Sequence, residues 1–130
     1  MSGLGRLEKA QRIVEAALDR KAEDPVVLDV RQVTSYADTF VILSGRSDRQ
    51  VRAIAEEIAL QLKQAGDPPL GVEGLGENRW VLIDAGDVVV HVFNPETRAH
   101  YALERLWSDA PVLEVELPEG AVENAGERAR

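Results

Sequence analysis

The sequence predicts an α+β protein, in which a mixed β-sheet of about five strands is flanked by helices. Two observations lead to this fold class: short apolar segments alternate along the chain with amphipathic helical segments, and residues 79–93 form a tight hairpin. A hairpin pairs its strands antiparallel, so the sheet is not purely parallel. The 130 residues fit one domain, which we expect over residues 1–117, followed by a flexible tail at 118–130.

The first helix is expected over residues 3–22, because apolar side chains recur there at steps of three and four. In this prediction Pro25 ends the helix, since the residue before a proline is disfavoured in helical geometry. Alternating side chains at residues 26–31 and an apolar run at 39–44 predict the first two strands. The expected inner face of the helix consists of Leu7, Ala10, Val14, Ala17, Leu18 and Lys21.

A second helix is predicted to begin after Ser47, because Ser47 and Gln50 have the spacing of a capping box. Gly66 is expected to end it, since glycine readily adopts the left-handed geometry common at helix C-termini. The apolar residues that recur at helical spacing between these ends are Val51, Ile54, Ile58, Leu62 and Ala65.

The second half of the chain is expected to contain further strands and a last helix. Asn94 and Pro95 predict the start of that helix, because asparagine caps well and proline fits the first turn, and it should run to about Trp107. The helix residues expected to pack on the sheet are Ala99, Ala102, Leu103 and Leu106. Short strands are expected at residues 71–73, 79–84 and 88–93, and the alternating residues 113–117 are consistent with a final strand.

The pairing within the hairpin depends on its loop. A two-residue loop of Ala85 and Gly86 is one interpretation. A three-residue loop with a left-handed Gly86 and a bulge is the alternative, and it shifts the pairing. The pairs expected from the two-residue loop are Trp80 with His91, Leu82 with Val89, and Asp84 with Asp87. In either case one face is purely aliphatic and belongs in the core, namely Val81, Ile83, Val88, Val90 and Val92.

The charge is distributed unevenly along the chain. Residues 1–66 carry ten Lys and Arg and ten Asp and Glu, whereas residues 67–130 carry five and thirteen, so the whole net charge of −8 lies in the second half. Such a surface repels nucleic-acid phosphates and attracts a basic protein. The alternative is that the acidic side chains only increase solubility.

A protein-binding surface is predicted in this acidic half, because tryptophan and tyrosine are favoured at interfaces and carboxylates pair with partner Lys or Arg. The candidate partner-binding residues are Trp80, Asp84, Asp87 and His91 of the hairpin, and Tyr101, Glu104 and Trp107 of the last helix. Two alternatives stay open. Asp84 and Asp87 can be turn-favouring residues exposed to water, and the aromatic side chains can seal an edge of the core.

Little in the sequence indicates an enzyme. With no cysteine and two scattered histidines, it offers no convincing zinc site, and we expect no catalytic residue, metal or cofactor. Residues 44–47 lie between a strand and a helix, where an anion can bind, but they lack the spacing and the lysine of a P-loop. No apolar run approaches the ~20 residues of a membrane span, and the N-terminus has no signal core, so we expect a cytoplasmic protein.

Residues 28–110 closely resemble the ribosomal silencing factor family, also called the Iojap family. The segments that carry the resemblance are Ala37-Asp38 followed by FVILSG, residues 47–55, Glu73-Gly74, WVLIDAGDVVVHVF at 80–93, Arg98 to Tyr101, Leu103-Glu104, Leu106-Trp107 and Asp109-Ala110. The resemblance implies a fold similar to that of nucleotidyltransferases without their catalytic acids.

The same resemblance implies that the protein binds the large ribosomal subunit through large-subunit ribosomal protein fourteen. The resemblance further implies that the bound protein blocks joining with the small subunit and represses translation when nutrients are scarce. Little direct nucleic-acid contact is expected, and a homodimer is a further prediction, because small proteins often self-associate. The alternative function is that of a nucleotide-binding or nucleotidyltransferase-like enzyme.

Overall fold

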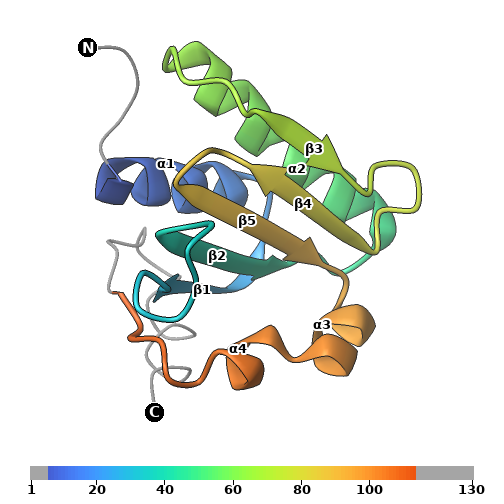
Figure 1. Ribbon diagram of the computed structural model, residues 1–130. Helices are drawn as coiled ribbons and strands as arrows, with labels where there is room; N and C mark the ends of the chain where they lie inside the picture. The colour runs from blue at the N-terminus through green and yellow to red at the C-terminus, as the bar shows by residue number, and fades with distance from the viewer. Residues whose placement is uncertain (1–5, 114–130) are drawn as a thin grey trace.

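A mixed β-sheet lies at the centre of the computed structural model, which describes residues 6–113 (Figure 1). Within these residues the five strands are ordered β1-β2-β5-β4-β3. They are β1 (Glu23–Asp29), β2 (Thr39–Ser44), β3 (Gly71–Glu73), β4 (Trp80–Asp84) and β5 (Val88–Phe93). Strands β2 and β5 are parallel and the other neighbours are antiparallel, which confirms the predicted fold class. Apart from Leu113, the expected final strand and the tail lie outside the described residues.

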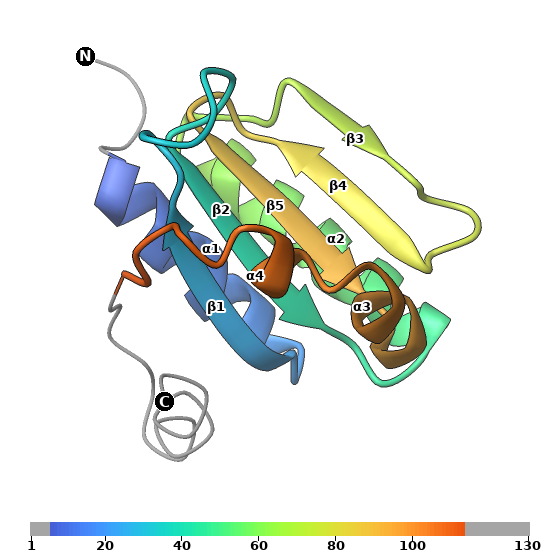
Figure 2. The ribbon, with the colours of Figure 1, turned by 60° about the horizontal axis from the view of Figure 1, so that its bottom comes forward.

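The helices divide between the two faces of the sheet. Helices α1 (Arg6–Asp19) and α2 (Asp48–Gln64) cover one face, which we call the closed face (Figure 1). Helices α3 (Pro95–Tyr101) and α4 (Leu103–Leu106) are much shorter and lie on the other side (Figure 2). In the described part of the chain, no helix is both long and apolar enough to cross a membrane.

Helix α2 begins and ends as its sequence predicts. The Ser47 side chain accepts a hydrogen bond from the Gln50 amide at 3.2 Å. The Gln50 side chain bonds the amide of Arg46 at 2.7 Å, one residue earlier than in a standard capping box. Gly66 follows the last turn with φ +79°, the left-handed geometry that glycine tolerates.

The end of the first helix was predicted too late. Helix α1 stops at Asp19, and the chain reverses through Lys21, whose φ is +66°. Strand β1 therefore begins before Pro25, which lies in an irregular stretch of pairing between Glu23 and Val26. Proline is tolerated there, because an irregular stretch of pairing does not need the backbone N–H that proline lacks.

The inner face of α1 was also predicted only in part. Leu7 is 53% exposed and Lys21 is exposed, whereas Ile13 and Ala16 are buried. The chain turns away at Lys21, so that residue never follows the helical spacing on which the prediction was based.

The expected hairpin pairing is wrong. Gly86 and Asp87 form the loop, because the Ala85 amide bonds the Val88 carbonyl at 2.9 Å, and Gly86 has φ +87°. Glycine therefore occupies the first loop position, where positive φ is required. The observed pairs are Trp80 with Phe93, Leu82 with His91, and Asp84 with Val89. The predicted aliphatic face is confirmed, because a shift of two residues keeps the alternation of the strands, but Asp87 lies in the loop and not opposite Asp84.

The last helix is two helices, not one. Its cap is confirmed, because the Asn94 side chain accepts from the Thr97 amide at 2.8 Å. Ala102, however, has φ +47° and separates α3 from α4. The break turns the helical faces, so Leu106 is 70% exposed, and Ala99 is also exposed. Of the four residues expected to pack on the sheet, Leu103 alone is fully buried.

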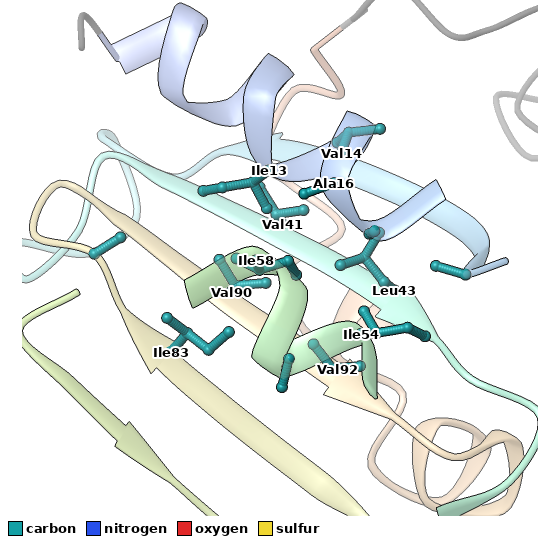
Figure 3. Packing of buried hydrophobic residues seen from close by; sticks show 14 of the residues in the cluster. Ile13, Val14, Ala16, Val41, Leu43, Ile54, Ile58, Ile83, Val90 and Val92 are labelled. Atoms are coloured by element: carbon teal, nitrogen blue, oxygen red, sulfur yellow. The ribbon is translucent and has the colours of Figure 1, made fainter. Parts of the chain in front are cut away.

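Two hydrophobic clusters lie on the two faces of the sheet. On the closed face, aliphatic side chains of α1 and α2 meet those of β2, β4 and β5 (Figure 3). The second cluster includes Phe40, Ile42, Phe93 and Leu103, and residues 102–113 run across it (Figure 2). The end of that segment pairs with β1, where the Leu113 amide bonds Val27. None of the described helices lies over β3 and β4 on this side (Figure 2).

Candidate functional site

The candidate site lies on the open face, which we define as the face of the sheet opposite α1 and α2. Strand β4 presents Trp80, Leu82 and Asp84 to this face, and all three are half-buried. The intervening Val81 and Ile83 point to the closed face and are fully buried. Strand β4 therefore contributes fully buried side chains to one face and partly solvent-exposed side chains to the other.

Aromatic rings from three elements meet at one end of the open face. The Trp80 ring lies 4.7 Å from that of Tyr101 and 5.0 Å from that of Phe93, measured between centroids. Tyr101 is 49% exposed, whereas Phe93 is fully buried against Trp80. Trp80 thus packs between a buried ring and an exposed one and keeps an accessible surface itself, an arrangement typical of interface anchors.

A second group of rings lies over β2. Trp107 packs edge-on against Phe40 with 5.5 Å between centroids, and Tyr36 contacts the same ring at 6.1 Å. Trp107 is half-buried and Tyr36 is 66% exposed. Both tryptophans of the chain therefore lie on the open face, and each packs on a buried phenylalanine.

His91 joins the two groups of rings from below. The Trp80 indole N–H donates to its Nδ1 atom at 3.1 Å, and its ring lies 4.9 Å from Phe40. His91 is only 5% exposed, and burial lowers its pKa to about 4. Because Nδ1 accepts a bond, the neutral ring carries its proton on Nε2, which has no hydrogen-bond partner among the described residues. His91 thus positions Trp80 rather than facing solvent.

The two aspartates of the hairpin lie in different environments. The Asp84 carboxylate is on the open face, where it accepts the Gly86 amide at 3.0 Å. Asp87 instead pairs with Lys9 of α1 at 3.3 Å, so it belongs to the helix side of the hairpin loop. The shifted register separates the pair that the sequence had placed opposite each other.

Lys9 is a buried cation that the sequence analysis missed. Its ammonium group contacts Asp67 at 2.9 Å and the Ala85 carbonyl at 2.8 Å, in addition to Asp87. Burial lowers the pKa of Lys9, but the bonds and charges of Asp67 and Asp87 outweigh this effect and leave the pKa raised. No local signal could reveal this contact, because it joins residues 76 and 78 positions apart.

Glu104 takes part in an internal ion pair. Its carboxylate accepts two bonds from the Arg98 guanidinium, at 2.9 and 3.1 Å, and the same guanidinium donates to Ser44 at 2.8 Å. The Arg98 side chain is 7% exposed and that of Glu104 is 28% exposed. Glu104 therefore holds α4 close to the end of β2, and a smaller part of it remains accessible.

Polar groups in residues 44–47 are bonded within the fold. The Gly45 amide bonds Phe93, and the side chains of Ser44 and Ser47 have the partners described above. A Cβ atom at Gly45 would lie 2.9 Å from the Val51 nitrogen, so close packing of α2 explains this glycine. Over residues 6–113, no group of three potential metal ligands occurs.

Comparison with known proteins gives consistent matches over most of the chain. A family model described as "Ribosomal silencing factor during starvation" matches residues 5–130. The chain is 47% identical over 109 residues to the ribosomal silencing factor of Halalkalibacterium halodurans, covering 84% of this chain and 93% of that protein. A crystal structure of a Chromobacterium violaceum protein is similar with a TM-score of 0.79 and 36% identity, covering 93% of this chain and 98% of that one.

A more distant relative comes from mouse. The chain is 35% identical over 99 residues to a protein named "Mitochondrial assembly of ribosomal large subunit protein 1", and the match covers 74% of this chain and 43% of that protein.

Proposed function

The chain belongs to the ribosomal silencing factor family, as its sequence predicted, and from this premise we propose that it binds the large ribosomal subunit. In this proposal the chain contacts large-subunit ribosomal protein fourteen. Its presence there prevents the small subunit from joining. The name of the mouse relative, which refers to the large subunit, supports this choice of subunit. The protein then acts in the cytoplasm as a translation repressor under nutrient limitation.

The open face is the surface that we assign to this contact. The observation that carries the assignment is that both tryptophans lie half-buried on this one face, with the exposed Tyr101 against Trp80. Rings that are already held by packing lose little freedom on binding, and such residues commonly dominate the energy of an interface. Leu82 extends the apolar surface between the two tryptophans and is also half-buried.

Charge complementarity supports a basic partner. The net charge is −8, and Asp84 lies on the open face, on the same strand as Trp80. Ribosomal proteins are generally basic, so opposite charges would accelerate the encounter and favour the correct orientation. Asp87 and Glu104 are held by Lys9 and Arg98, and in this proposal they contribute mainly to the local field.

Blocking subunit joining needs only occupancy of the site. A bound protein of 14.3 kDa excludes the small subunit from the same surface by its volume alone. We therefore propose a non-enzymatic regulator, in which no covalent step is required. Self-association also stays a prediction, which light scattering over a range of concentrations would check.

Co-sedimentation with isolated large subunits tests the proposal. Wild-type protein should sediment with large subunits and not with small ones, and binding should weaken as salt rises. Replacing both Trp80 and Tyr101 by alanine should weaken binding at least about tenfold, because two anchors are lost. Leu60→Ala is the matched control, since Leu60 on α2 is 46% exposed but lies across the sheet from the open face. Unchanged binding by the double variant would contradict the assignment.

Charge reversal is best made at one aspartate. Asp84→Lys should weaken binding with little loss of stability, because among residues 6–113 the Asp84 carboxylate bonds only the nearby Gly86 amide. Asp87→Lys places a second cation beside the buried Lys9, so it should destabilise the fold instead. Thermal unfolding of both variants distinguishes a lost contact from a damaged fold.

A further inference from the structure

We propose that a cleft at the edge of the open face receives an arginine side chain of the basic ribosomal protein, an inference that rests on the proposed function. The cleft has a volume of about 570 Å³ and lies between the β3–β4 connection and α3. The residues on which the argument depends are Leu75, Glu77, Arg79, Trp80 and Tyr101, all of which line it.

The aromatic wall of the cleft suits a planar cation. Trp80 and Tyr101, whose ring centroids are 4.7 Å apart, contribute to this wall, and Tyr101 is 49% exposed. A guanidinium group stacks on such rings and is attracted by their π-electrons, and it is more weakly hydrated than the ammonium of lysine. The chemistry of this wall therefore favours arginine over other polar side chains.

Glu77 supplies the countercharge. Its side chain is exposed at the cleft, and no ion pair joins it to another residue in the described part of the chain. A carboxylate in this state can accept two parallel bonds from a guanidinium without breaking an existing contact. Leu75, which is 46% exposed, offers apolar surface for the methylene groups of the same side chain.

The connection that carries Leu75 and Glu77 is held in a fixed shape. The Asn78 amide bonds the Gly74 carbonyl at 3.0 Å, and the Asn78 side chain accepts the Gly76 amide at 3.1 Å. Gly74 has φ +95°, and a Cβ atom there would lie 2.2 Å from the Trp80 carbonyl oxygen. The connection thus rests directly on the backbone of Trp80, which means that the two walls of the cleft are organised before any partner binds.

Arg79 lines the same cleft and would repel an incoming cation. Its presence makes an acidic occupant the competing possibility, in which Arg79 and not Glu77 forms the ion pair. The net charge of −8, the aromatic wall and the exposed acidic residues Glu73 and Glu96 nearby in β3 and α3 favour the cation. The two possibilities predict opposite effects of neutralising these side chains.

Neutralising each charge separately decides between them. Glu77→Gln should weaken binding to isolated large subunits about tenfold, and Arg79→Gln should strengthen it a few-fold, because it removes a repulsion. Both residues are exposed, so both variants should fold as the wild type does, which thermal unfolding checks. The reverse pattern would show an acidic occupant, and no effect of either variant would show an empty cleft. Either result overturns the proposal.

The Trp80→Ala, Tyr101→Ala double variant separates this failure from that of the proposed function. If that variant loses binding while both cleft variants bind normally, the open face is the contact and the cleft proposal alone is wrong. If all of them bind normally, the open face itself is not the contact.

Chemical crosslinking tests the identity of the occupant directly. The chain has no cysteine, so Leu75→Cys introduces a unique thiol at the cleft. Arg79→Gln is included because Arg79 would otherwise capture the reagent. A reagent with a maleimide and a phenylglyoxal group should then link this cysteine to an arginine of large-subunit ribosomal protein fourteen in the bound complex. Leu60→Cys in the same background is the control, and no link from Leu75→Cys would overturn the proposal.

Discussion

The two faces of the sheet are built from different side chains and have different degrees of burial. The closed face is aliphatic, and its residues from α1, α2 and the strands are almost fully buried. The open face is aromatic, and Trp80, Leu82 and Trp107 stay half-buried. The closed face provides most of the stability, whereas the open face keeps apolar area that folding alone does not remove from water.

The difference follows from the lengths of the covering helices. Helices α1 and α2 have 14 and 17 residues, enough to cover the strands that they cross. Helices α3 and α4 have 7 and 4 residues and are separated by the left-handed Ala102. Among the described residues, the shorter pair cannot cover the sheet, so part of it remains available to another protein.

Truncating a side chain of the closed face should have the largest effect on stability. Ile58→Ala should lower the free energy of unfolding by about 3–4 kcal/mol, because Ile58 is fully buried and leaves a cavity. Leu60→Ala, on the exposed side of the same helix, should change it by less than about 0.5 kcal/mol. Urea unfolding measures both. A similar loss in both variants would contradict the assignment of α2 to the closed face.

Removing the buried cation beside the open face should have the next largest effect. Arg98→Met should cost about 2–3 kcal/mol, since Glu104 and Ser44 lose the bonds that Arg98 donates and α4 loses this link to β2. Binding to large subunits should fall as well, because the segment that carries Trp107 is no longer fixed. A variant that unfolds normally and binds normally would show that this link is dispensable.

Acid should lower the free energy of unfolding through His91, which is buried beneath the open face. The pKa of His91 is about 4 in the folded protein, below the ~6.5 of an unfolded chain, so the unfolded state binds the proton first as pH falls. This group therefore contributes fully above pH ~6.5, and its contribution is lost as pH falls toward 4. The loss at pH 5 should be about 2 kcal/mol.

Unfolding titrations at several pH values measure this effect. His91→Phe should remove that share of the acid sensitivity and leave the share of the carboxylates. His100→Gln serves as the control, since it replaces the other histidine, which is exposed on α3. An unchanged profile for His91→Phe would show that the buried ring does not govern acid sensitivity.

The sequence predicted the elements whose signals are local. The bounds of β2, β3 and β5 and both ends of α2 agree with the structure, because apolar runs and capping residues determine them. The hairpin register was wrong because only the backbone shows whether Gly86 is the first or the second loop residue. The break at Ala102 was missed because alanine favours helix, and the Arg98–Glu104 bond that accompanies it has no sequence signal.

The candidate site was predicted unevenly for the same reason. Alternation along β4 placed Trp80, Leu82 and Asp84 together, which the structure confirms. The partners of Asp87 and Glu104 depend on tertiary contacts, and in the case of Asp87 the partner lies 78 residues away. Aromatic side chains could be placed on a face by periodicity, but the partners of charged ones could not.

Placing both indoles on one side gives the molecule a built-in optical signal. Because the closed face contains neither tryptophan, ultraviolet emission of the protein arises entirely beside the open face. Trp80 also donates a bond to an imidazole, so changes at that ring should alter its brightness. Docking of any macromolecule there can therefore be followed in real time with the unlabelled, native chain.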